Sequence, residues 1–155
     1  MIQRIQSLYL SLTIILSLLL IKGSILTFFD NSGAAINITF SGIVKVIEGQ
    51  STELIGKLIP LSALIIAIPA IALITILLFK NRKVQMRLTI MGTILTISLI
   101  GLLAYHSYSI IDKYNASIRP GLKMIFPILI LIFNILAYIG IRKDERLVKS
   151  YDRLR

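Results

Sequence analysis

The chain has 155 residues, of which 56% are apolar and 15% are charged, with 17 Lys plus Arg against 7 Asp plus Glu. Soluble domains are usually about 45–50% apolar and about 25% charged, so this composition excludes an ordinary soluble domain and a disordered chain. Because the sequence contains no Cys, it also excludes disulfides, zinc–thiolate sites and iron–sulfur clusters.

Four apolar stretches are each long enough to cross the hydrocarbon layer as a helix, which takes about 20 residues. Their central parts carry no Asp, Glu, Lys, Arg or His, and Lys22 and Lys123 lie near span ends, where they can extend to the headgroups. The sequence therefore predicts an all-α membrane protein, a four-transmembrane-helix antiparallel bundle forming a single integral membrane domain over residues 1–155. The predicted spans are 5–29, 58–79, 88–105 and 122–141.

The N-terminal stretch also has features of a signal peptide, with Arg4 as the basic region and residues 8–21 as the apolar region. No small-residue cleavage pattern follows, and the apolar stretch resumes after Lys22 and continues to Phe29. We therefore expect a retained signal anchor that forms the first span.

The loop between the first two spans, residues 30–57, is the longest predicted segment outside the membrane. Ile36, Ile38 and Phe40 alternate with polar residues, and residues 43–47 continue as an apolar, β-branched run. This period of two is typical of a strand with one covered face. We predict a small extracytoplasmic β hairpin between helices one and two, which either caps the helix ends or contacts a partner.

Positive charge is distributed unequally between the two sides of the predicted spans. The side that holds both termini and the 80–87 turn has 11 basic and 3 acidic residues, a net of 11 − 3 = +8, against 6 − 4 = +2 on the other side. Basic loops stay in the cytoplasm, so we expect a multi-pass protein of the bacterial cytoplasmic (inner) membrane with both termini cytoplasmic. The charge is split among short juxtamembrane segments, which favours lipid headgroups over nucleic acid as its partner.

The cytoplasmic basic tail, residues 142–155, is expected to continue the fourth helix. It either lies on anionic lipid headgroups or docks a partner. The residues expected to make these contacts are Arg142, Lys143, Arg146, Lys149 and Arg153.

Small and polar residues inside the spans allow helices to approach closely and to hydrogen-bond across an interface. Asn134 is the one strong amide within a span, so it is expected to face another helix, another subunit or a polar ligand. The candidate helix–helix or partner contacts are Asn134, Ala63, Ala67, Ala70, Gly92, Thr93 and Thr96.

Candidate chemistry is sparse. His106 and Ser107 are adjacent, and adjacent side chains point apart, so they do not form a nucleophile–base pair. We expect no catalytic residue, cofactor or metal site, and an interfacial position for His106.

The opening residues 1–10, MIQRIQSLYL, resemble the start of a family of Bacteroidota four-helix membrane proteins known as domain of unknown function 4293. Members are similar to this chain over its whole length in that start, in four apolar spans and in a basic tail. The resemblance implies a bacterial cytoplasmic membrane and brings no catalytic residue or substrate. Arg4 and Gln6 fall within the matching motif, and we expect Gln3 or Gln6 to bond a neighbour at the inner interface.

The favoured hypothesis is an accessory or scaffold subunit of a larger bacterial inner-membrane complex, respiratory, protein-export or envelope biogenesis, bound to other membrane subunits and without chemistry of its own. The alternative is a small transporter, channel or lipid-binding membrane protein that acts as an oligomer. A membrane enzyme would need His106, Asp112 or the loop carboxylates Glu48 and Glu53 to converge.

Overall fold

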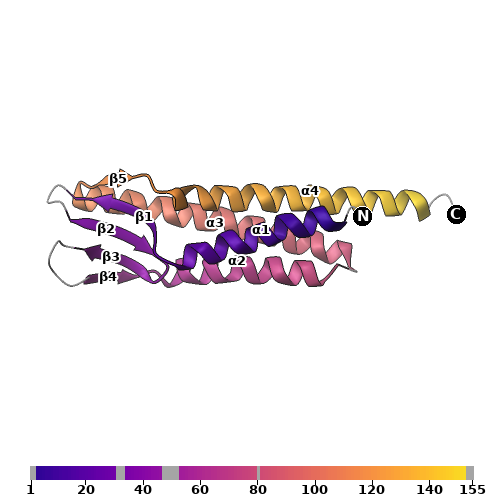
Figure 1. Ribbon diagram of the computed structural model, residues 1–155, viewed down its shortest axis with the longest axis horizontal. Coiled ribbons are helices and arrows are strands. Elements are labelled where there is room, and N and C mark those ends of the chain that lie inside the picture. The colour runs from indigo at the N-terminus through magenta and orange to yellow at the C-terminus, as the bar shows by residue number, and fades with distance from the viewer. Residues whose placement is uncertain (1–2, 31–33, 47–52, 80, 153–155) are drawn as a thin grey trace.

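A bundle of four α-helices forms the body of the molecule (Figure 1). The computed structural model describes the backbone of residues 3–30, 34–46, 53–79 and 81–152, and the side chains of 5–30, 34–46, 54–79 and 81–146. Helices α1 and α3 each pack against both α2 and α4, so successive helices are neighbours and antiparallel. The helices are α1 Gln3–Ile21, α2 Ile59–Leu77, α3 Arg82–Tyr114 and α4 Phe126–Asp152.

The bundle has the length and composition of a multi-pass membrane protein. In the described part of the chain, three helical segments are long and apolar enough to span a membrane: Ile59–Leu77, Arg82–Tyr114 and Leu122–Arg146. The apolar part of α1, Ile5–Ile21, is shorter. With 33 residues, α3 is about 50 Å long and exceeds a hydrocarbon layer of about 30 Å, so part of it projects from the membrane. The end of the bundle near Tyr114 is called the outer end, and the end near Arg82 is called the inner end.

A five-stranded antiparallel sheet stands on one end of the bundle (Figure 1). The predicted hairpin was too small, because the 30–57 loop supplies β2, β3 and β4, and β1 and β5 from outside the loop extend the sheet beyond β2. The order is β4-β3-β2-β1-β5, with β1 from the end of the predicted first span and β5 from the loop after α3. The strands are β1 Ser24–Phe29, β2 Ala35–Thr39, β3 Gly42–Val46, β4 Glu53–Lys57 and β5 Ser117–Arg119.

The predicted first span, 5–29, was also wrong at its C-terminal end. Helix α1 stops at Ile21, and Gly23 takes φ +74°, the left-handed conformation that commonly ends a helix. Beyond it the chain extends as β1, where Thr27 pairs with Asn37 of β2 on one side and Arg119 of β5 on the other. The apolar run resumes directly after this turn, at Ile25, so hydropathy alone did not mark the change from helix to strand.

The sheet and the bundle share one apolar core. The predicted third span, 88–105, covers only the middle of α3, whose last turns run under the inner face of the sheet. There Ile110 packs in the same cluster as Phe28, Ile36 and Ile38. Ser62 in the first turn of α2 adds a polar link, because its Oγ donates to the carbonyl of Phe40 at 2.6 Å. The sheet is therefore held on the helices rather than hanging from them on flexible connections.

Buried residues recur along each helix at alternating spacings of three and four. This heptad spacing favours left-handed packing of neighbouring helices. Near the outer end the buried positions are apolar, whereas near the inner end many are polar. The stripes are Gln6, Leu10, Thr13, Ser17 and Leu20 in α1; Leu61, Ile65, Ile68, Ala72 and Thr75 in α2; Gln85, Thr89, Gly92, Thr96 and Leu99 in α3; and Ile130, Asn134, Ala137, Ile141 and Asp144 in α4.

Candidate functional site

The two faces of the sheet differ in what they contact. Side chains alternate along a strand, so Ile36 and Ile38, which are buried in the shared core, define the inner face. The neighbouring positions point outward, and cross-strand pairing places Asn37 beside Val44 and Val44 beside Leu54. The outer face toward β4 is therefore apolar, with Val44 half-buried and Leu54 exposed.

The β4 edge, Glu53–Lys57, ends the sheet at this apolar side. Val46, Leu54 and Ile55 retain 37%, 48% and 40% of their surface exposed. As the last strand in the order, β4 has a neighbour on one side within the described chain, which leaves a row of backbone donors and acceptors facing outward. Such an edge, flanked by exposed apolar side chains, is a template for adding another strand.

The opposite edge of the sheet is built differently. Strand β5 has three residues, and short edge strands offer few backbone groups to a partner. Arg119 on this strand places its guanidinium 5.5 Å from the centre of the Phe29 ring, folded back over the sheet. The β4 edge is therefore the better docking edge of the two.

Asn134 lies in the interior of the bundle, at 2% exposure. Its Nδ2 donates to Thr96 Oγ1 of α3 at 3.2 Å, and a Cβ added to Gly92 would lie 3.7 Å from its Oδ1. Three of the candidate contact residues, Asn134, Thr96 and Gly92, therefore meet at one α3–α4 contact. Thr93 is half-buried and bonds the carbonyl of Thr89 in its own helix.

The alanines of α2 are placed elsewhere. Ala63 and Ala70 are exposed and Ala67 is half-buried, while the buried stripe of α2 runs through Ile65 and Ile68. These alanines therefore contribute little to packing within the bundle, and Ala63 and Ala70 lie on its outer surface.

At the inner end of the bundle Gln6 bonds a neighbouring helix, as expected, through a partner that the sequence reasoning missed. Gln6 of α1 donates through Nε2 to Asp144 Oδ2 of α4 at 2.5 Å, and Asp144 is 5% exposed. A Cβ added to Gly140 would lie 2.8 Å from Gln6 Cγ, so this glycine makes room for the glutamine. Asp144 Oδ1 has no hydrogen-bond partner among the described residues. Asp144 is one of the three acidic residues in the charge count for the side of the termini, and the heptad spacing from Asn134, Ala137 and Ile141 places it on the buried face.

The basic residues at the start of the tail lie on the outside of α4. Arg142, Lys143 and Arg146 are exposed and border, with Tyr138 and Ile139, a shallow hollow of about 440 Å³. Cations around an apolar floor at the membrane surface suit lipid headgroups. The side chains of Lys149 and Arg153, also expected here, lie outside those that the structure describes.

Comparison with known proteins gives one match. Residues 2–154 match the domain of unknown function family DUF4293. The chain belongs to the DUF4293 family. No curated protein and no solved structure matches it. The opening motif that carried the resemblance now has a structural correlate, because its Gln6 is the residue that joins α1 to Asp144 of α4.

Titratable groups do not gather in this DUF4293 chain as they would in a metal centre. Within the described residues, no three of His, Cys, Asp or Glu lie close enough together to hold a metal ion. His106 is half-buried at the outer end of α3, where its ring contacts Tyr105 edge-on at 5.3 Å. Ser107 Oγ donates to the carbonyl of Leu103 at 2.7 Å, so this hydroxyl is engaged within its own helix. Glu48 lies outside the described residues.

Proposed function

We propose that this protein is an accessory or scaffold subunit of a larger bacterial inner-membrane complex and has no chemistry of its own. The observation that carries the proposal is the β4 edge, which no strand of the described chain pairs on its outer side and which is flanked by the exposed side chains of Val46, Leu54 and Ile55. Exposed apolar side chains gathered at one site outside the membrane are typical of a protein interface. The partner would add an extended segment to β4 and cover these side chains.

The attachment of the sheet supports this role. An apolar core shared with α3 and the Ser62–Phe40 hydrogen bond fix the sheet relative to the membrane spans. A rigid edge costs less conformational entropy to dock than a mobile loop does. A scaffold subunit needs this property, since it must present one surface at a constant height and angle.

The orientation is part of the proposal. Helix α1 begins and α4 ends at the end of the bundle opposite the sheet (Figure 1), and this end carries the larger positive charge. We place both termini in the cytoplasm and the sheet outside the cytoplasmic membrane. Arg142, Lys143 and Arg146 then meet the anionic inner leaflet, which the hollow they border supports.

Site-specific photo-crosslinking tests the proposed docking. A photo-reactive amino acid at Leu54 should give one discrete crosslinked product with a membrane protein when the chain is expressed at its native level. The same amino acid at Ser117, exposed on the opposite edge of the sheet, should not. The substitution Leu54→Asp should remove the stoichiometric partner from gentle detergent extracts, whereas Ser117→Asp should leave it bound. A partner that is retained equally by both variants would refute docking at β4.

A second candidate function is lipid binding, the alternative that an apolar groove between α3 and the start of α4 favours. As the protein's sole function, it predicts that the purified protein carries lipid and lacks a stoichiometric protein partner. Mild extraction followed by mass spectrometry of both the bound proteins and the bound lipids separates the two functions.

A further inference from the structure

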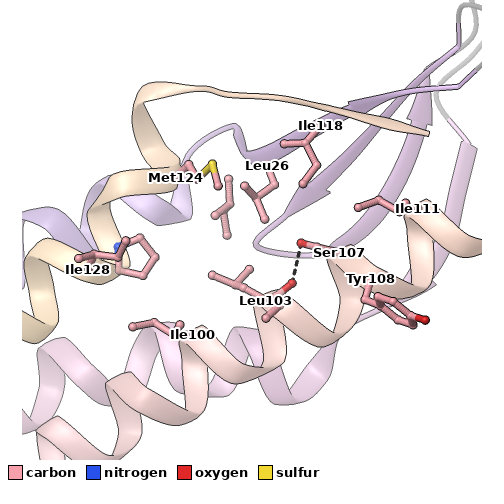
Figure 2. Close-up of a pocket in the computed structure, with 12 residues that line it drawn as sticks. Leu26, Ile100, Leu103, Ser107, Tyr108, Ile111, Ile118, Met124 and Ile128 are labelled. Atoms are coloured by element: carbon pink, nitrogen blue, oxygen red, sulfur yellow. Dashed lines mark hydrogen bonds between the residues drawn. The ribbon is translucent and has the colours of Figure 1, made fainter. Parts of the chain in front are cut away.

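An apolar groove of about 400 Å³ opens between α3 and the start of α4, beneath β1 and β5 (Figure 2). Small-molecule and lipid sites have volumes of about 300–1,000 Å³, so the groove has the size of a ligand site. Its walls come from four parts of the chain. They include Leu26 of β1, Ile100 and Leu103 of α3, Ile118 of β5, and Met124 and Ile128 from the short 3-10 helix Leu122–Ile125 and the first turn of α4, which follows it.

The groove lies at the boundary of the hydrocarbon layer. A layer of about 30 Å corresponds to about 20 helical residues. Counted back along α4 from the exposed basic residues Arg142 and Arg146, at the start of the tail, that length ends at about residues 122–126. The other boundary therefore falls at the level of Met124 and Pro127 in the groove wall. The groove opens at the level where the acyl chains of a lipid begin.

Positive charge gathers at the rim on the side of the sheet. Lys123 precedes the wall residue Met124, and its ammonium donates a hydrogen bond to the carbonyl of Lys22. This contact engages one of the three ammonium N–H groups and brings two lysines to the same corner. Arg119 does not join these lysines, because its guanidinium lies over the Phe29 ring. The exposed Asp112 beside Ile111 is the nearest acid along α3. The rim is thus cationic and the interior is apolar.

We propose that this groove holds an acyl chain of an anionic phospholipid from the leaflet on the sheet side, with its phosphate against Lys123 and Lys22. The apolar walls accommodate the chain, and the lysines select the charged headgroup. The inference goes beyond the proposed docking of a protein at β4 and depends only on the membrane placement of the bundle. An experiment that refutes lipid binding in the groove would not refute protein docking at β4, and the reverse is also true.

Native mass spectrometry of the full chain in mild detergent tests the proposal, with phosphatidylglycerol and phosphatidylcholine supplied in equal amounts. The wild-type protein should retain phosphatidylglycerol preferentially. Lys123→Gln should lower the ratio of bound phosphatidylglycerol to phosphatidylcholine by about fivefold, the effect of one basic residue near an anionic headgroup. Lys113→Gln removes the same charge from the outer end of α3 and should leave the ratio unchanged.

A second pair of variants tests the groove itself. Ala104 lines the groove, so Ala104→Trp should fill it and abolish retention of both lipids, whereas Ala63→Trp on the exposed surface of α2 should not. Equal retention of the two lipids by the wild type, or undiminished retention by a folded Ala104→Trp variant, would overturn the proposal. The proposal would also be overturned if the molecule that Ala104→Trp displaces were a quinone or a polyprenyl phosphate in place of a phospholipid. If Ala104→Trp does not fold, the comparison of Lys123→Gln with Lys113→Gln still tests the proposal.

Discussion

Replacing Gly140 by alanine tests whether the Gln6–Asp144 hydrogen bond closes the inner end of the bundle. An added Cβ would lie 2.8 Å from Gln6 Cγ and 3.6 Å from Gln6 Cδ. The shorter distance is below any normal carbon–carbon contact, so the glutamine must move. Because Gln6 reaches Asp144 from this position at 2.5 Å, its displacement should break the bond.

The expected magnitude follows from two opposing effects. Alanine is preferred to glycine inside a helix by about 1 kcal/mol. Loss of a hydrogen bond to a charged group costs about 1.5–3 kcal/mol, and here it leaves a buried carboxylate without that donor. The net effect of Gly140→Ala is a destabilisation of about 0.5–2 kcal/mol, which lowers the melting temperature by roughly 2–6 °C in a chain of this size.

Gly101→Ala is the matched control, because Gly101 lies in α3 and no atom of the described structure comes within 4 Å of its added Cβ. It should gain the helix preference alone and be stabilised by about 1 kcal/mol. Thermal unfolding in mild detergent, followed by circular dichroism, measures both variants. Gly140→Ala should also lose its cost in a Gln6→Ala background. If Gly140→Ala is as stable as Gly101→Ala, the contact does not close the bundle and this reasoning fails.

Three further substitutions test other contacts. Gly42→Ala should release β4, because Gly42 has φ +151° and an added Cβ would overlap the carbonyl oxygen of Gly56. Faster amide exchange in β4 would show the release. Gly56→Ala is the tolerated control, since no atom of the described chain lies within 4 Å of its added Cβ. Ser62→Ala should cost about 1 kcal/mol by removing the bond to the Phe40 carbonyl, and an unchanged melting temperature would show that this bond does not anchor the sheet. Asn134→Leu should cost only about 0.6 kcal/mol of stability, the average for an interhelical hydrogen bond in a membrane protein. The cost stays small because Thr96 keeps its bond to the Gly92 carbonyl. A melting temperature lowered by more than about 5 °C would contradict a simple packing role.

Apolar length was enough to predict the helical bundle from the sequence. Runs of about 20 apolar residues have few other folds available, since lipid satisfies no backbone hydrogen bonds. The same argument failed at Ser24–Phe29, where an apolar run becomes β1. Inside a sheet that rests on helix ends, a strand is as apolar as a membrane helix, and hydropathy does not separate the two. Gly23 was the available signal, because a glycine at the end of an apolar run commonly terminates a helix.

The full sheet was beyond the sequence reasoning for a different reason. Strand β5 has three exposed residues and no apolar alternation, so nothing local marks it as a strand. It forms because α3 continues past the membrane to Tyr114 and returns the chain alongside β1, where Phe28 pairs with Ile118. Pairing between residues about 90 positions apart depends on helix length, and the predicted end of that helix at residue 105 removed the basis for it.

The buried positions of α4 show how much of the site the sequence did contain. Ile130, Asn134, Ala137, Ile141 and Asp144 follow one heptad stripe, and a search for that spacing would have placed Asp144 inside the bundle beside a residue of α1. Charge counting assigned it to the solvated tail instead, because acidic residues are usually exposed. The opening motif and the tail, treated as separate features, are two halves of one contact, Gln6 with Asp144.

The distribution of polar and apolar core positions gives the two ends of the bundle different roles. At the inner end, Gln85 Nε2 donates to the carbonyl of Thr75 at 2.8 Å and Gln6 donates to Asp144, so directed hydrogen bonds fix the relative positions of α2 with α3 and of α1 with α4. At the outer end the buried helix positions are mainly apolar, and hydrogen bonds such as that of Ser62 to the Phe40 carbonyl hold the sheet on the helices. The groove and the open β4 edge therefore lie at the end of the bundle opposite the buried Gln6 and Gln85 hydrogen bonds, which keep the four helices in register.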